Sequence, residues 1–262
     1  MNNPDNTAHE RAVIDQFTRQ AQGFAGSAEL HVHEVLQLII DAATLSPNHR
    51  VIDLACGPGS VACAVAKHAA HVIGLDATPA MLDQASELAR GMKLANVEWK
   101  EGSIYAAPYA DGSFDAVTCR FAFHHLKDPP RAFAEMVRLT ATGGRVVLCD
   151  GIASDEPEKA RAFNQMERWR DPSTVEFRTF GYLHKLFVEM GLGEPYARSF
   201  HVPYLATDLV KASFPAGDDR SGLLALIENS IEDDTLGMGA RMSAEGVRIA
   251  FRSVVLSAVK LG

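Results

Sequence analysis

The stretch VIDLACGPGSVACAVA, residues 51–66, decides the fold of this chain. It joins a short β-branched strand at 51–55 to a helical pattern through a turn that contains Gly57 and Gly59. Glycines lack a Cβ, so the backbone can turn tightly there and a ligand can approach the start of the helix. The order strand, glycine turn, helix is typical of the first unit of a nucleotide-binding α/β sheet.

The same alternation of strand and helix continues from residue 50 to residue 159. Short apolar runs alternate with stretches whose apolar residues recur every 3.6 residues, which indicates β-α-β crossovers. We therefore expect a mostly parallel sheet with helices on both faces. The expected strands are 51–55, 71–76, 96–102, 115–121 and 145–150, and the expected helices between them are 61–70, 80–92 and 130–139.

Segments on both sides of this core complete the expected organisation. Two helices, 8–24 and 28–44, come before the sheet; helices at 155–169 and 179–190 and strands at 194–205 and 252–260 come after it. The passage 206–250 should hold two or three helices and form a substrate lid as an insertion before the last strand. Together with the helices before the sheet, 8–44, it should roof the acceptor site. The expected domains are an N-terminal helical cap over 1–49, a cofactor-binding core over 50–154, and a remainder with the lid over 155–262.

Composition restricts the classes of function. The chain has 262 residues, a formal net charge of −8 and four cysteines without C-x-x-C spacing. The negative charge argues against nucleic acid as a partner, and the scattered cysteines argue against a disulfide scaffold or a cysteine zinc site. No apolar run approaches the ~20 residues of a membrane span, and no signal peptide is recognisable. We expect a cytoplasmic monomer or homodimer that binds a small molecule and neither metal nor membrane.

Asp76, at the end of the second expected strand, is a candidate ligand for a ribose. It lies 23 residues after Asp53, close to the ~20-residue offset at which an acidic side chain reaches ribose hydroxyls. The alternative is that Asp76 only caps the helix that begins near Pro79. The alternative for the turn at Gly57 and Gly59 is that its glycines serve packing between strand and helix and contact no ligand.

Three blocks of sequence together resemble the class I S-adenosylmethionine-dependent methyltransferases. They are residues 51–66, HVIGLDATPAMLDQA at 71–85, and the segment from EGS to VVLCD at 101–150. The resemblance is closest to the small-molecule branch that includes the ubiquinone and menaquinone methyltransferases. It implies a doubly wound α/β fold with seven strands in the order 3-2-1-4-5-7-6, the seventh antiparallel. It also implies S-adenosylmethionine as cofactor and methyl transfer to a small-molecule acceptor.

The resemblance further implies cofactor contacts by position. Asp53 and the Gly57–Gly59 loop would hold the methionine part, with Ala55 among the contacts. Asp76 would hold the ribose, and Ala77 and Met81 would lie against the adenine. Ser103 and Ile104 would read the adenine edge, although the family often has an acidic residue where Ser103 stands. Arg120 would lie beside the methionine moiety.

Two histidines and a carboxylate are the catalytic candidates. His124 and His125 follow the fourth expected strand and Asp150 ends the fifth, and in the implied order these strands are neighbours. An imidazole with a pKa near ~6.5 can take a proton at neutral pH, and an adjacent carboxylate fixes its tautomer. We expect one histidine, His124 being favoured, to pair with Asp150 and to deprotonate or orient the acceptor. Alternatively, the histidine pair only caps backbone groups.

Three functions remain open from the sequence. The first is a methyltransferase whose acceptor atom is O, N, C or S, and the second is a cofactor-binding protein without catalysis. The third is a nicotinamide-dependent oxidoreductase, which rests only on the pattern Gly57-x-Gly59-x-x-Ala62. The run RWRDPS at 168–173 could hold an aromatic or anionic acceptor, although a salt-bridged helix face is the simpler interpretation.

Overall fold

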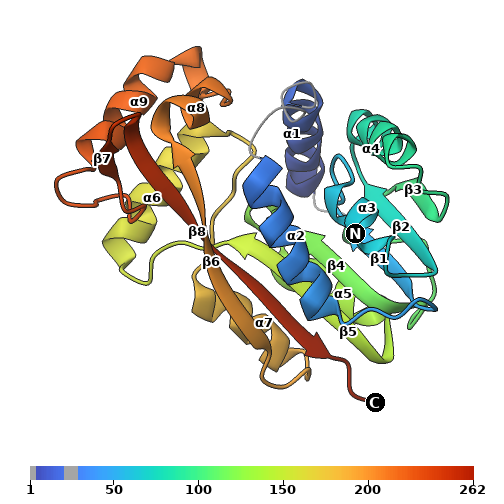
Figure 1. Cartoon of the computed structure of the whole chain (residues 1–262). Helices are drawn as coiled ribbons and strands as arrows, with labels where there is room; N and C mark the ends of the chain where they lie inside the picture. Colours follow the sequence, from blue (N-terminus) through green and yellow to red (C-terminus); the bar gives the residue numbers. More distant parts are fainter. Residues whose placement is uncertain (1–3, 21–28) are drawn as a thin grey trace.

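A mixed β-sheet runs through the computed structural model of the chain, which describes residues 4–20 and 29–262 (Figure 1). The strand order is β3-β2-β1-β4-β5-β8-β6, and the short β7 pairs with β8. β1 to β5 pair in parallel, and β8 is antiparallel to both β5 and β6. This confirms the expected order, with β8 in the seventh position and β7 as an additional strand. The strands are β1 (Arg50–Leu54), β2 (His71–Asp76), β3 (Val97–Glu101), β4 (Phe114–Arg120), β5 (Thr140–Gly151), β6 (Tyr196–Leu205), β7 (Arg241–Ser243) and β8 (Gly246–Val259).

Helices cover both faces of this sheet, as expected for parallel strands joined by crossovers. α2, α3 and α4 pack on one face, and α5 and α7 pack on the other (Figure 1). Their bounds are α2 (Glu29–Ala43), α3 (Ser60–Val65), α4 (Pro79–Gly91), α5 (Pro129–Leu139) and α7 (Phe180–Glu189).

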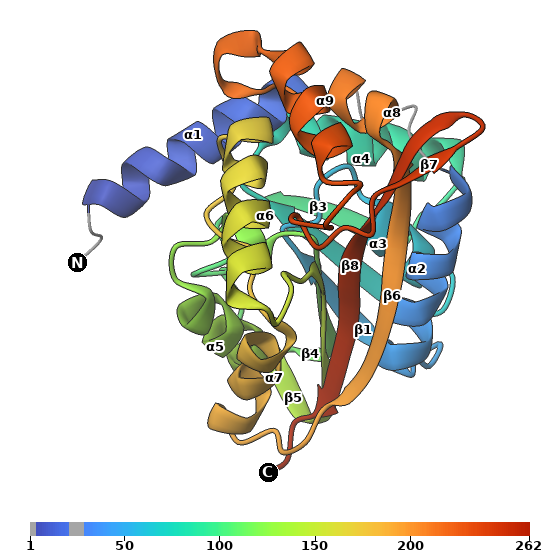
Figure 2. The same cartoon turned by 90° about the vertical axis from the view of Figure 1, so that its left-hand side faces the viewer.

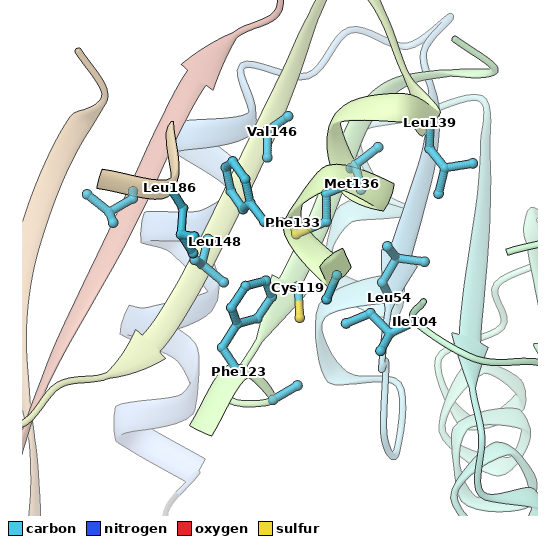
Figure 3. Close-up of a cluster of buried hydrophobic side chains, with 14 of the residues drawn as sticks. Leu54, Ile104, Cys119, Phe123, Phe133, Met136, Leu139, Val146, Leu148 and Leu186 are labelled. Atoms are coloured by element: carbon cyan, nitrogen blue, oxygen red, sulfur yellow. The ribbon is translucent and has the colours of Figure 1, made fainter. Parts of the chain in front are cut away.

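The strands divide their side chains between two apolar layers with a period of two. In β1, Val51 packs into the cluster of α2 and α3, while Ile52 packs into the cluster of α5 and α7. Figure 3 shows the second cluster, in which Phe133 of α5 and Leu148 of β5 lie together. Because both faces are covered, the central strands are continuous apolar runs rather than alternating ones.

The long strands β6 and β8 continue past the sheet into a lobe with its own apolar cluster (Figure 2). Phe163, Leu223 and Phe251 are buried there. The lobe contains α6 (Pro157–Arg170), α8 (Ala206–Lys211) and α9 (Arg220–Asn229). Most of the segment expected to form a lid therefore packs in this lobe.

Several boundaries differ from the sequence prediction, among them the start of β5, which lies at Thr140 rather than at 145. The last strand begins at Gly246 rather than at 252, because the burial of Val247, Ile249 and Phe251 already has the period of a strand. The helix expected over 61–70 ends at Val65, and the Asn96 amide donates to the carbonyls of the turn that follows. α1 (Pro4–Gln20) begins four residues before the expected start at 8, and α2 agrees with its expected range to within one residue at each end. The expected helical residues 21–24 and 28 lie outside the described residues.

The cysteines and the helices add two further observations. All four cysteines are buried and unpaired: Cys56, Cys63, Cys119 and Cys149. No helix in the described part of the chain combines the length and the apolar character needed to cross a bilayer.

Candidate functional site

A cavity of about 240 Å³ lies at the carboxyl ends of β1, β2 and β4. Its walls come from the turns after these strands and after β3, and from one face of α1. This is the edge of an open α/β sheet where ligands bind. Ten of the thirteen predicted site residues line the cavity: Asp53, Ala55, Gly57, Asp76, Ala77, Met81, Ser103, Ile104, Arg120 and His125. The other three, Gly59, His124 and Asp150, lie outside the lining.

The Asp76 carboxylate is buried in the cavity wall and joins two turns. Its Oδ2 accepts a hydrogen bond from the Gly57 amide at 2.8 Å, and its Oδ1 accepts one from the Thr78 amide at 2.8 Å. Burial raises the pKa of Asp76, and these two amides oppose that rise. The Thr78 hydroxyl and the Ala77 amide also stabilise the ionised form of this carboxyl group, which lies in the cavity wall as a hydrogen-bond acceptor.

The two glycines of the turn serve different purposes. Gly57 has φ +52°, and a Cβ built on it would meet nothing within 4 Å. Gly59 has φ +82°, and its Cβ would lie 2.7 Å from the Trp99 ring and 2.8 Å from the Ala85 Cβ. Gly57 therefore leaves open space at the cavity, whereas Gly59 is required by backbone conformation and close packing.

Asp53 is a second buried carboxyl group at the cavity. Thr118, which the sequence analysis did not single out, donates its hydroxyl to Asp53 Oδ1 at 2.7 Å. Burial raises the pKa of Asp53 to about 7, although Thr118 and the nearby Arg120 guanidinium oppose the rise. A cationic ligand group beside this carboxyl would favour its ionised form.

Two residues next to the cavity have left-handed backbone conformations without being glycine. Ala55 and Phe121 both have φ +53°, and each directly follows a strand, β1 and β4 respectively. Such a conformation costs on the order of 1 kcal/mol or more for a residue with a Cβ. Both residues line the cavity, so the strain lies at the point where the chain turns around the ligand space.

His124 and Asp150 pair with each other behind the cavity wall. His124 Nδ1 lies 2.6 Å from Asp150 Oδ1, and the His124 amide donates to Asp150 Oδ2 at 3.1 Å. The His124 ring stacks on Phe177 with ring centroids 4.2 Å apart. The pairing inferred from the sequence is present, but the favoured histidine does not line the cavity.

His125 is the histidine that lines the cavity. Its Nδ1 lies 3.0 Å from the Ser173 hydroxyl oxygen, and that hydroxyl donates to Asp171 Oδ1 at 2.5 Å. The edge-to-face contact with Phe17 of α1 has ring centroids 4.9 Å apart. Burial, together with the neighbouring His124, lowers the pKa of His125 to about 3, so the ring is neutral at physiological pH.

α1 contributes a wall to the cavity, in the part of the chain where a helical cap over the acceptor was expected without named residues. The helix lines the cavity with His9, Val13, Ile14 and Phe17. Their spacing of three and four residues is the pattern of one helix face, and this was the signal that could have identified them. Among the described residues that line the cavity, none comes from 206–250. The segment 206–250 packs mainly on β6 and β8 and within itself, and a lid formed by it stays a prediction.

In the run at 168–173, Arg170 agrees with the simpler interpretation of a salt-bridged helix face. Arg170 forms two 2.7 Å hydrogen bonds with the buried carboxylate of Glu167, so it is neutralised within its own helix. Asp171 and Ser173, which follow the helix, hold His125 instead. Nothing in sequence spacing signals a contact between residues 48 positions apart. Within 4–20 and 29–262, no three His, Cys, Asp or Glu side chains form a group that could hold a metal ion.

The sequence and the structure of this chain are similar to those of several known proteins. Residues 52–148 match a family model described as a methyltransferase domain. The uncharacterized methyltransferase YcgJ of Bacillus subtilis is 26% identical over 246 residues, which are 93% of this chain and 97% of that protein. The crystal structure of YcgJ has a TM-score of 0.79 at 25% identity and covers 88% of this chain and 99% of that one.

Other relatives match in part or in fold alone. The demethylmenaquinone methyltransferase of Deinococcus radiodurans is 41% identical over 112 residues, which are 42% of this chain and only 46% of that protein. The geranyl diphosphate C-methyltransferase of Streptomyces coelicolor A3(2), crystallised with S-adenosyl-L-homocysteine, has a TM-score of 0.61 at 16% identity. That match covers 87% of this chain and 79% of the other, and it shows a shared fold.

Proposed function

We propose, on the premise that this chain is a class I S-adenosylmethionine-dependent methyltransferase, that the cavity holds the cofactor and a small-molecule acceptor side by side. The observation that carries this proposal is the Asp76 carboxylate in the cavity wall beside Gly57. A carboxylate at the end of the second strand suits the two neighbouring hydroxyls of a ribose. The open space at Gly57 leaves room for the ligand to pass close to the backbone.

The strand order supports an orientation for the cofactor. β3, β2, β1 and β4 are successive neighbours, so their turns lie in that order along the cavity. We assign the adenine to Ser103 and Ile104 after β3 and to Ala77 and Met81 after β2. Asp76 holds the ribose, and Asp53, Ala55, the Gly57 loop and Arg120 hold the methionine part. The reactive end then points toward the turn after β4, where His125 lies.

In this reaction the residues of the chain bind and orient the reactants and exclude water. The bound cofactor supplies a methyl group on a sulfonium, which an acceptor lone pair displaces in line. Asp53 binds and orients the cationic end of the cofactor, and the apolar face of α1 excludes water from the reacting groups. Catalysis then rests mainly on holding two reactants in one geometry.

Calorimetry with S-adenosylhomocysteine and with NAD tests the cofactor assignment. We expect S-adenosylhomocysteine to bind and NAD not to bind, and Asp76→Ala to weaken binding at least tenfold because hydrogen bonds to a charged group contribute ~1.5–3 kcal/mol each. Glu101→Ala, which removes an exposed carboxylate at the end of the adjacent β3, is the matched control and should bind normally. Normal binding by a folded Asp76→Ala protein would remove the assignment. A labelled-methyl assay over a panel of acceptors then separates turnover from binding without catalysis.

A further inference from the structure

We propose that His125 Nε2 accepts a hydrogen bond from an uncharged O–H or N–H group of the methyl acceptor, and that the cavity selects acceptors that join this group to an apolar body. The inference rests on the proposed function and deepens it, because it names the class of acceptor and the residue that orients it. It also differs from the expectation that His124 faces the acceptor.

The hydrogen-bond chain behind His125 fixes which ring nitrogen carries the proton. The Ser173 hydroxyl has one proton, and Asp171 Oδ1 takes it at 2.5 Å while also accepting the Ser173 amide at 3.0 Å. Ser173 Oγ can therefore only accept from His125 Nδ1, 3.0 Å away. In a neutral imidazole with Nδ1 protonated, Nε2 carries the lone pair. Because His125 lines the cavity, we infer that Nε2 is the hydrogen-bond acceptor that it presents there.

The surroundings of His125 keep its ring uncharged. The titratable and charged groups around it are His124 on the same turn, Asp171 and Arg170 at the end of α6, and His9 of α1. Burial, His124 and Arg170 lower the pKa of His125, and Asp171 alone among the charged groups opposes them. A neutral ring avoids repulsion with the sulfonium of the proposed cofactor. A ring with so low a pKa is a weak base, so its task is to orient the acceptor.

Several apolar side chains line the cavity on the side of His125. Val13, Ile14 and Phe17 of α1 face the cavity together with Phe121 and Leu126 from the turn after β4. His125 itself lies between Phe17 and His124, at ring-centroid distances of 4.9 Å and 4.1 Å, so its position is fixed. Ligand sites of this kind bind an apolar body and orient it through a few placed polar groups.

The methyl transfer forms one bond to the methyl carbon and breaks one. A lone pair on the oxygen or nitrogen of the acceptor forms the new bond to the methyl carbon, and the electron pair of the broken C–S bond stays on sulfur. The proton of the acceptor, made more acidic by the new bond, is held by Nε2 through its hydrogen bond during transfer and is then lost to water. His125 directs the lone pair toward the methyl group because it holds the proton on the other side.

Nitrogen-detected NMR of protein labelled with ¹⁵N-histidine tests the tautomer without any ligand. The His125 signals are assigned by their loss in His125→Phe. We expect Nδ1 to be protonated and Nε2 unprotonated from pH 8 to pH 5, and Ser173→Ala to abolish this preference. A ring that is protonated on Nε2, or that titrates near pH 6.5, would overturn the proposal.

Binding of two probes, 2-naphthol and 2-methylnaphthalene, tests the acceptor class. On protein saturated with S-adenosylhomocysteine, fluorescence titration should show roughly 2- to 10-fold tighter binding of the naphthol, the range that one neutral hydrogen bond gives. His125→Phe should remove this difference, and Ser173→Ala should reduce it while binding of 2-methylnaphthalene is unchanged. His201→Phe, at an exposed position of β6, is the control and should keep the difference.

Three outcomes contradict the proposal: equal binding of the probes by the wild type, binding of neither, or a preference that survives in His125→Phe. His125→Phe is expected to fold because the Ser173 hydroxyl keeps Asp171 as its partner. Failure of S-adenosylhomocysteine to bind would instead contradict the proposed function. The NMR result on the free protein would still decide the tautomer.

Discussion

At the scale of single residues, Asp53 carries an electrostatic cost that a ligand can remove. Its pKa of about 7 in the folded protein is far above the usual value of 3.8. The folded state therefore binds this proton more tightly than the unfolded state does. The resulting loss of stability is absent below about pH 4, grows as the pH rises, and is complete above pH 7. A cofactor that places a cation beside Asp53 would offset this cost.

Asp53→Asn should therefore stabilise the protein increasingly as the pH rises. We expect the Tm difference between variant and wild type to be larger at pH 8 than at pH 5, because the amide cannot ionise and still accepts the Thr118 hydroxyl. The affinity for S-adenosylhomocysteine should fall at least tenfold at pH 8. Scanning calorimetry at both pH values measures the first effect, and Asp83→Asn on α4 is the control. A Tm difference independent of pH would show that Asp53 is ionised in the free protein.

Substitution of Gly57 should mainly affect ligand binding, whereas substitution of Gly59 should mainly affect stability. Gly57→Ala adds a methyl group to open space and should weaken S-adenosylhomocysteine binding, with a stability loss of only ~1 kcal/mol from its positive φ. Gly59→Ala has a similar strain and also forces its Cβ against Trp99 and Ala85, so it should lose about 1–3 kcal/mol more. Urea denaturation and calorimetry measure the two effects. Equal losses of stability would mean that the packing around Gly59 relaxes freely.

At the scale of elements, α6 depends on a buried ion pair within the helix. The Glu167 side chain is fully buried, and its carboxylate is bound by both guanidinium contacts of Arg170. Removing one partner of such a pair leaves an uncompensated buried charge, so Glu167→Ala should cost about 3–5 kcal/mol. Glu189→Ala, which breaks the exposed i,i+4 pair with Lys185 on α7, should cost less than ~0.5 kcal/mol. Chemical denaturation compares the two, and similar losses would contradict the role of the α6 pair.

The sequence predicted the elements whose signals are local. β2 matches its expected range of 71–76, because an apolar run between turn signals marks a strand buried on both faces. β7 was missed because Arg241 and Met242 are exposed and carry no apolar alternation. The early start of β8 does carry that alternation, at Val247, Ile249 and Phe251, so its signal was present and was not read. Local patterns report burial, and a short exposed strand gives little such signal.

Some residues of the candidate site could be predicted from the sequence and others could not. Asp76 and Gly57 were predictable because they follow consecutive parallel strands, whose ends meet at one edge of the sheet. The contact of His125 with Ser173 depends on how the chain after α6 returns to the cavity. That path is set by tertiary packing, and no spacing in the sequence encodes it. The choice between His124 and His125 therefore required the structure.

At the scale of the whole molecule, the cavity and the α6–α9 lobe are built on separate apolar clusters. The cavity lies between α1 and the turns of the sheet, while Phe163, Leu223 and Phe251 form the core of the lobe. Figure 2 shows α8 and α9 beside the far ends of β6 and β8. A ligand in the cavity should therefore stabilise one part of the molecule more than the other.

Hydrogen exchange should show that ligand binding protects the cavity more than the α6–α9 lobe. We expect S-adenosylhomocysteine to raise protection in α1 and in the turns after β1, β2 and β4, because these segments line the cavity and ligand binding suppresses local opening. Exchange in α9 and β7 should change little. Mass spectrometry of peptic peptides measures both. New protection over 220–243 would support the lid function expected from the sequence, and protection confined to 51–104 would exclude α1 from the site.

The burial of all four cysteines makes the native protein ready for site-specific labelling. Burial raises the pKa of Cys63 to about 11 and the pKa values of the other three thiols further above their usual range. Maleimide dyes react with exposed thiolates, so the native cysteines should remain unmodified at neutral pH. Arg11→Cys on α1 and Glu228→Cys on α9, both at exposed positions, would then carry a dye pair. The separation of the two helices could be followed by energy transfer in a protein that keeps every native thiol.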